Sequence, residues 1–224
     1  MKISNDTLDV LKNYATINSN ILIHPGKLLR TIGPQSNIFA EAMVKEEFPV
    51  EIPLWDLNHF LSVVSLFDKP DFTFEEKCVV ISSGAKKVRY FYAAKEVITF
   101  KDAEMVMDDP PIKFTLTQDV IGDIIKGSAV LQAPDLLIQS HDGSNLELAL
   151  TDIENDTTNT LTFKVDNWTP TDVSFMMIMR VEELKLLAGD YEVSIAEELI
   201  SEFKHTSRDV TYWIATNIKS KYGE

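Results

Sequence analysis

The 224-residue sequence is short of several features, and each shortage excludes a class of protein. Its single cysteine, Cys78, excludes internal disulfides and clusters of thiolate metal ligands, and it predicts a reducing compartment. No apolar run reaches the length of a membrane-spanning helix, and Met1-Lys2-Ile3-Ser4 leads into polar residues, so we expect neither a membrane segment nor a signal peptide. What remains is an ordinary globular composition, 45% hydrophobic and 25% charged.

Basic residues are also scarce. Lys and Arg together number 21 against 35 Asp and Glu, which gives a formal net charge of −14, and no cluster of basic residues occurs. Proteins that bind nucleic acid by direct contact usually carry a row of basic residues on one surface, because neutralising the phosphates supplies much of their affinity. The charge balance therefore argues against a simple nucleic-acid binder.

Signatures of catalysis are missing as well. The sequence has no phosphate-cradling glycine loop, nucleophile elbow or zinc-protease helix motif. The acidic stretch with Asp152, Glu154 and Asp156 lacks the glycine and the final carboxylate of a calcium loop, since Thr157 and Phe163 occupy those positions. A solvated acidic strand edge explains it better, and we expect no metal, no cofactor and no enzymatic activity.

The sequence contains an internal repeat. The stretch DVLKNYATINSNILIHPG aligns with DIIKGSAVLQAPDLLIQSHDG, so that Asp9 and Lys12 fall opposite Asp123 and Lys126. Each stretch predicts an amphipathic helix, a short apolar strand and a turn with glycine. A second pair of helix-turn-strand segments begins at Trp55 and Val181. Loose alignment of two unrelated α+β halves remains an alternative.

These patterns predict an α+β fold of two similar domains, each with two helices on a mainly antiparallel sheet. Asp109-Pro110-Pro111 cannot continue a helix, so the connector is placed at about residues 98–111. The domains are then 1–110 and 111–224. Strands are expected at 27–44, 88–93, 145–153, 160–165, 175–179 and 210–215.

The four expected helices have polar faces with few charged residues. In the first, Leu8, Val10, Leu11, Tyr14, Ala15 and Ile17 share the apolar side. In the third, expected over 117–131, the apolar side has Val120, Ile121, Ile124 and Ile125. The short fourth helix should bury Val181, Leu184, Leu187 and Ala188. The outer sides carry few Glu–Lys pairs, and a plain solvated surface is one explanation.

Two segments resemble a known family. LKNYATINSN, residues 11–20, resembles the first-helix signature of sliding clamps from T-even-type bacteriophages, and WDLNHFLSVVSLF, residues 55–67, resembles the second. The length, the repeat, the acidic balance and the turn Gly189-Asp190-Tyr191 agree with that family. The resemblance implies the duplicated DNA clamp fold.

The same resemblance implies the function. Such clamps are head-to-tail homotrimeric rings of six similar domains, with helices around a central hole that holds duplex DNA without sequence preference. They tether the DNA polymerase to its template in the cytoplasm of the infected bacterial host, serve viral DNA replication and late transcription, and are loaded by an ATP-driven clamp loader. A closed ring needs no tight grip, because it cannot leave DNA sideways.

Site residues follow as expectations. The residues expected to face DNA are Lys12, Asn13, Thr16, Asn58, Ser62, Lys126 and Lys185, with Arg180, Lys2 and Lys86 as further candidates. The pocket for a partner peptide is expected at Met105, Val106, Met107, Pro110 and Pro111, and the subunit seam at Tyr90, Phe91 and Tyr92. Methionines suit adaptable binding surfaces, but the connector residues could instead only hold the connector against the sheet. The simpler alternative for the three aromatics is that they fill a core.

A second function stays open. A non-encircling acidic adaptor with the same duplicated fold would recruit replication or transcription proteins without surrounding DNA. The mass in solution separates the two hypotheses, because only the ring requires three copies.

Overall fold

The structure is a computed structural model that describes residues 1–155 and 157–223. By its internal contacts the chain divides into two units, Met1–Ala103 and Glu104–Glu224. Residues 104–111, expected to belong to a connector, group with the second unit.

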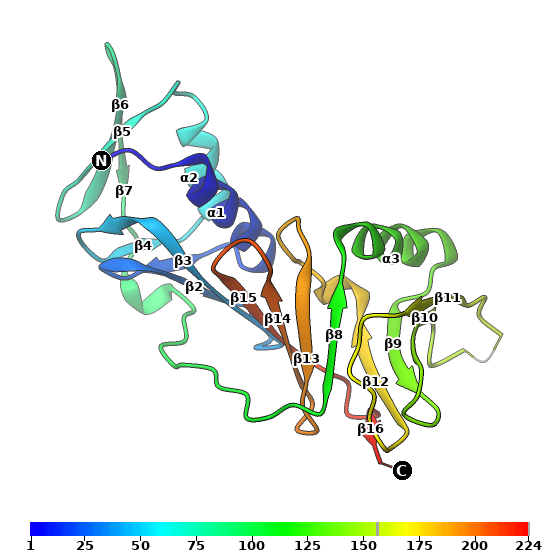
Figure 1. The fold of residues 1–224 in the computed structure, drawn as a ribbon. Helices are drawn as coiled ribbons and strands as arrows, with labels where there is room; N and C mark the ends of the chain where they lie inside the picture. The colour runs from blue at the N-terminus through cyan, green and yellow to red at the C-terminus, as the bar shows by residue number, and fades with distance from the viewer. Residues whose placement is uncertain (156, 224) are drawn as a thin grey trace. The chain divides into compact units, whose positions relative to one another are not determined.

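Unit 1 contains two α-helices and strands that pair antiparallel in three groups (Figure 1). Its elements are α1 (Asn5–Ile17), β1 (Ile21–Ile23), β2 (Gly26–Ile32), β3 (Ile38–Phe48), β4 (Ile52–Leu54), α2 (Leu57–Val64), β5 (Asp71–Phe74), β6 (Cys78–Ser83), β7 (Lys86–Phe91) and the 3-10 helix η1 (Lys95–Val97). Strand β1 pairs with β4, β2 with β3, and β5, β6 and β7 form a three-stranded sheet. The strand expected over 27–44 is thus two strands joined by a turn.

Helix α1 begins where the sequence provides a cap. The Ser4 hydroxyl accepts a hydrogen bond from the Thr7 amide, which satisfies one of the helix's open donors. Glu46 of β3 fixes this end, since its carboxylate accepts from the Ser4 amide at 2.6 Å and from the Thr7 hydroxyl. Burial raises the pKa of Glu46, but these hydrogen bonds outweigh it and the pKa lies below its ordinary value.

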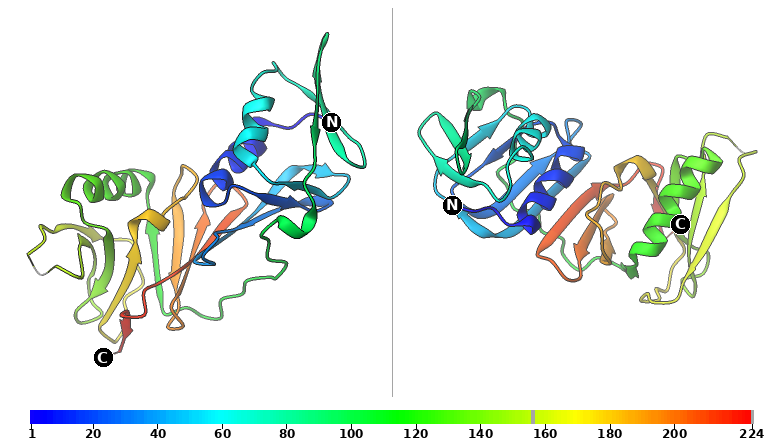
Figure 2. Two further views of the ribbon diagram at one scale, coloured as in Figure 1. Left: turned by 180° about the vertical axis from the view of Figure 1, so that it is seen from behind. Right: turned by 90° about the horizontal axis from the view of Figure 1, so that it is seen from above.

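The two helices of unit 1 lie side by side (Figure 2). Val10, Leu11, Tyr14 and Ile17 of α1 are buried, as the apolar periodicity predicts. Helix α2 begins at Asp56, whose carboxylate accepts from the His59 amide at 2.8 Å. The outer sides of both helices are exposed.

The described residues of unit 2 form one long helix and the strands of two antiparallel sheets. Its elements are β8 (Ile112–Leu116), α3 (Gln118–Leu131), β9 (Asp135–Ser140), β10 (Leu146–Thr151), β11 (Leu161–Val165), β12 (Phe175–Arg180), the 3-10 helix η2 (Val181–Glu183), β13 (Tyr191–Ile195), β14 (Ile200–His205), β15 (Val210–Ala215) and β16 (Lys221–Tyr222). One sheet has the order β11-β10-β9-β12-β16, and in the other β8, β13, β14 and β15 are neighbours. The predicted α+β class with antiparallel sheets is confirmed.

Helix α3 confirms the third expected helix but buries a narrower side. Ile121 and Ile124 are buried, whereas Ile125, also expected in the core, is 46% exposed. The helix packs closely at Gly127, where an added Cβ would lie 2.9 Å from side-chain atoms of Leu150 and Leu161. Close approach at this glycine leaves Ile125 outside the contact.

The fourth expected helix is wrong. Residues 181–188 form only the 3-10 turn η2 followed by an irregular segment, so the described part of the chain has three α-helices. The Leu187 amide donates to the Tyr212 hydroxyl at 3.1 Å, and the Tyr191 hydroxyl donates to the Leu187 carbonyl at 2.5 Å. Two buried tyrosines thus bind the backbone groups that a helix would pair internally. Burial raises the pKa of both hydroxyls.

Candidate functional site

The outer side of α1 and α2 presents polar groups that bond mainly within their own helices. Lys12 is exposed, and its Nζ lies 3.1 Å from the Asp9 carboxylate. The hydroxyl of Thr16 donates to the Asn13 carbonyl at 2.7 Å, and that of Ser62 donates to the Asn58 carbonyl at 2.8 Å. Asn13 is half-buried and the other expected DNA-facing residues of these helices are exposed. This surface offers few charges.

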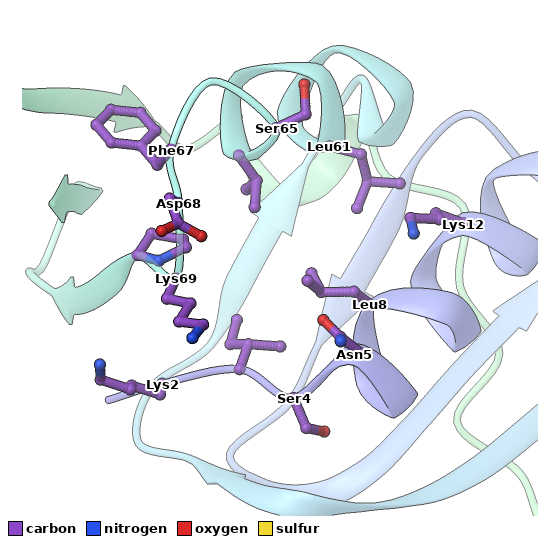
Figure 3. Close-up of a pocket in the computed structure, with 13 residues that line it drawn as sticks. Lys2, Ser4, Asn5, Leu8, Lys12, Leu61, Ser65, Phe67, Asp68 and Lys69 are labelled. Carbon is purple, nitrogen blue, oxygen red and sulfur yellow. The ribbon is translucent and has the colours of Figure 1, made fainter.

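A pocket of about 520 Å³ opens between the start of α1 and the end of α2, and we name it the lysine pocket (Figure 3). Lys2, Lys12 and Lys69 line it, together with Asp68 and the apolar side chains Leu8, Leu61, Val64, Phe67 and Pro70. Lys69 was missed by sequence reasoning, because nothing in the turn before β5 marks it as close to α1. The pocket gathers three ammonium groups in an acidic chain.

In unit 2 the expected cations differ in their surroundings. Lys126 is exposed on α3, whereas Lys185 is half-buried in the segment after η2 and not on a helix. Arg180 binds the fully buried carboxylate of Asp135 at 3.1 Å and approaches Glu182 at 3.6 Å. Burial alone would lower the pKa of Arg180, but the nearby carboxylates of Asp135 and Glu182 have the larger effect. The pKa therefore lies above its ordinary value. Its guanidinium is therefore occupied by structural partners.

The expected peptide-pocket residues lie in an extended segment before β8. Met105, Met107, Pro110 and Pro111 are half-buried, and Val106 is 76% exposed. Val106 thus offers an apolar side chain to solvent, and its two methionine neighbours are partly covered.

The three aromatics expected at the seam divide by environment. Phe91, at the end of β7, is 67% exposed. The Tyr90 hydroxyl donates to the Asp56 carbonyl at 3.2 Å, and its ring packs edge-on against Phe60. Tyr92 is half-buried, and burial raises its pKa to about 12. Of the three aromatics, only Phe91 is largely exposed to solvent.

The described residues present neither a metal-binding cluster nor a membrane-spanning helix. No cluster of three or more His, Cys, Asp or Glu side chains there could hold a metal ion, and Asp156 of the acidic stretch lies outside that part. No helix in the same residues is long and apolar enough to cross a membrane.

Comparison with known proteins identifies the family. No family model matches the chain. The sliding clamp of Vibrio phage KVP40 is 32% identical over 221 residues, which cover 96% of this chain and 99% of that protein. The sliding clamp of Escherichia phage RB69 is 26% identical, with 99% of both chains covered. The chain belongs to the sliding clamp family.

Solved structures agree on the fold of sliding clamps. PCNA from Entamoeba histolytica matches with a TM-score of 0.69 at 12% identity, over 94% of both chains. A. fulgidus PCNA, bound to the C-terminal region of FEN-1, matches at 0.68 with 13% identity over 96% of both. The Helicobacter pylori beta clamp matches at 0.73 with 11% identity, over 96% of this chain and 65% of that one.

The resemblance to phage clamps is thereby confirmed, and so is the clamp fold. The chain is a DNA sliding clamp, a protein that keeps a polymerase on its template. The residues that face DNA, the peptide pocket and the seam stay predictions.

Proposed function

We propose that three copies of this clamp close head to tail into a ring around duplex DNA. The observation that carries the proposal is one edge strand in each unit: β7 lies at the edge of its sheet in unit 1, and β11 at the edge of its sheet in unit 2. An edge strand offers unpaired backbone groups to another chain. When one edge of a chain pairs with the other edge of the next copy, the contact is heterologous. Repeated contacts of this kind close into a ring if the rotation between neighbouring copies permits it.

The ends of the two edge strands offer complementary contacts. Strand β7 carries Lys86, Lys87 and Arg89 and ends at the exposed Phe91. Strand β11 begins at Leu161, which is 37% exposed, and Asp166 follows its end. Antiparallel pairing with Phe91 opposite Leu161 sets Lys86 opposite Asp166. The seam then has an apolar contact at one end and an ion pair at the other.

The ring holds DNA by enclosure. Exposed Lys12 and Lys126, with the polar side chains of α1 and α2, offset repulsion between an acidic protein and DNA without anchoring it at one register. Weak and water-mediated contacts suffice, because a closed ring cannot leave sideways. The clamp itself carries out no chemistry and needs no cofactor.

Partners dock through apolar surface, and the segment from Met105 to Pro111 is the proposed pocket for short peptides of the DNA polymerase and of an ATP-driven clamp loader. The complex of A. fulgidus PCNA with the C-terminal region of FEN-1 supports peptide capture by this fold. The ring acts in the cytoplasm of the infected bacterial host.

Light scattering after size exclusion tests the ring. We expect about 76 kDa, three times the 25.3 kDa of one chain, with dissociation on dilution. Lys86→Glu should weaken the trimer, adding Asp166→Lys should restore it, and Lys27→Glu on β2 is the matched control.

A mass of one chain at every concentration would overturn the ring and favour the acidic adaptor. A trimer that survives Lys86→Glu unchanged would instead refute the proposed strand pairing. Retention on nicked circular DNA, with loss after linearisation, tests enclosure directly.

A further inference from the structure

The first-helix signature ends in a turn that belongs neither to the expected DNA-facing surface nor to the lysine pocket. This turn is Asn18-Ser19-Asn20, which we name the asparagine turn, and it joins α1 to β1. Asn18 is 4% exposed and Asn20 is 8% exposed. Asparagine is mostly found at the surface, and burying an amide group is costly unless it is hydrogen-bonded. The hydrogen bonds of these two buried side chains therefore indicate what the turn does.

Asn18 and Ser19 connect three elements of unit 1. The Asn18 amide donates to the Tyr14 carbonyl at the end of α1 at 2.9 Å, and the Asn18 Nδ2 donates to the Ile32 carbonyl of β2 at 2.7 Å. The Ser19 carbonyl accepts from the amide of Leu57, the first residue of α2, at 2.7 Å. The asparagine turn thereby fixes the end of α1 and the start of α2 against β2.

Asn20 extends this network to the segment that follows η1. Its amide donates to the Asn18 Oδ1 at 3.1 Å, which fixes the backbone of the turn. Its own Oδ1 accepts from the Thr99 amide at 2.9 Å. Thr99 follows Ile98, which is only 6% exposed, and both residues stand at the start of the expected connector. One side-chain hydrogen bond thus attaches the first residues of the connector to unit 1.

The other polar contacts of this segment are weaker. The Lys95 Nζ lies 2.6 Å from the Glu51 carboxylate, and the Arg30 guanidinium lies 3.3 Å from the Asp102 carboxylate. Ion pairs that water reaches contribute little, because solvent screens them. The bond from Thr99 to Asn20 is partly buried, so breaking it leaves polar groups without a partner. After Asp102, residues 103–111 form neither helix nor strand.

We propose that Asn20 is a positioning residue for partner binding, an inference that rests on the proposed peptide pocket at Met105–Pro111. By holding Thr99, Asn20 fixes the point from which the chain runs toward this pocket. A fixed starting point leaves the pocket segment fewer conformations, so less conformational entropy is lost when a peptide binds. The asparagine turn then sets the connector and both helices of unit 1 from one buried site.

Isothermal titration calorimetry with a synthetic peptide of the C-terminal residues of the cognate DNA polymerase tests this role. The test variant is Asn20→Leu, which keeps the approximate size of the side chain and removes the acceptor. Asn20→Asp keeps an acceptor oxygen for the Thr99 amide. Val10→Ala is the control for lost stability, because it truncates a buried residue of α1 outside the asparagine turn. Hydrogen exchange at the Thr99 amide, followed by NMR, reports on the anchor itself.

We expect Asn20→Leu to speed exchange at the Thr99 amide and to weaken peptide binding, each by about two- to tenfold, the range set by one net hydrogen bond. Asn20→Asp should restore both towards the values of the unmodified protein, and Val10→Ala should leave the peptide affinity unchanged. Unchanged affinity in Asn20→Leu, or an equal loss in Val10→Ala, would overturn the positioning role. So would an Asn20→Asp protein that binds as weakly as Asn20→Leu, because the acceptor would then not be the cause.

Failure of this inference and failure of the proposed function are distinguishable. If the unmodified protein and Asn20→Leu bind the peptide equally well, the peptide pocket stands and the role of Asn20 is wrong. If the unmodified protein binds no peptide, the proposed partner binding fails with it, and the exchange rates of the Thr99 amide alone decide whether Asn20 holds the connector.

Discussion

Replacing Arg180 with alanine should destabilise unit 2 because it strands a buried charge. The Asp135 side chain is 0% exposed, and its carboxylate binds Arg180 at 3.1 Å and accepts the Ile153 amide at 3.1 Å. Without the guanidinium, the carboxylate keeps the bond from the Ile153 amide but loses the cation that balances its charge. Arg180 therefore has a structural role in β12, whatever it contributes to the expected DNA-facing surface.

The expected magnitude follows from the exposure of the two partners. Removing one partner of a fully buried ion pair costs about 3–5 kcal/mol. The Arg180 side chain is 47% exposed, so water already reaches one side of the pair and can enter when the arginine is gone. We expect Arg180→Ala to lower the free energy of unfolding by about 2–3 kcal/mol, or the urea midpoint by about 1 M.

Urea denaturation followed by circular dichroism measures this loss, at one protein concentration because assembly adds to the apparent stability. Lys204→Ala, which removes an exposed positive charge from β14 of the same unit, is the control and should change stability by less than about 0.5 kcal/mol. The double variant Asp135→Ala with Arg180→Ala should lose less than the sum of the two single losses. An Arg180→Ala protein as stable as the control would refute the reasoning.

Two further substitutions test packing and burial. Gly189→Ala should lower the free energy of unfolding by about 2–4 kcal/mol, because Gly189 has a φ of 148° and the added Cβ would lie 2.3 Å from the His205 ring. The control Gly84→Ala, at a φ of 58° with open space around the added Cβ, should cost about 1–2 kcal/mol. Equal losses in thermal or urea unfolding would contradict the steric argument. Burial raises the pKa of Tyr92 to about 12, so between pH 10 and 12 the folded protein keeps this proton and the unfolded chain loses it. The free energy of unfolding should therefore fall as pH rises through that window, and Tyr92→Phe should reduce part of the fall. An identical pH profile of the two proteins in unfolding curves would exclude the contribution.

The parts of the fold that depend on local chemistry were predictable from the sequence. Ser4, Asp56 and Thr117 cap α1, α2 and α3, and each precedes a segment with helical spacing of apolar residues. The antiparallel strands follow from β-branched and aromatic runs between turn residues. Local signals of this kind do not depend on partners elsewhere in the chain.

The errors come from contacts that the local sequence does not encode. The segment after Val181 has helical spacing, but the hydroxyls of Tyr191 and Tyr212 bind its backbone instead. The lysine pocket depends on the pairing of Met1 with Phe72, which brings Lys69 near the start of α1. Neither the competing hydroxyls nor this strand pairing leaves a periodic pattern in the sequence.

The short η2 turn has a consequence for the symmetry of the proposed ring. Unit 1 has two α-helices, whereas the described part of unit 2 has one, so the two halves of the duplicated chain are no longer equivalent. In a closed trimer the lining of the hole would repeat three times per revolution instead of six. DNA inside would meet alternating surfaces, and a rotation of 60° would no longer restore its environment.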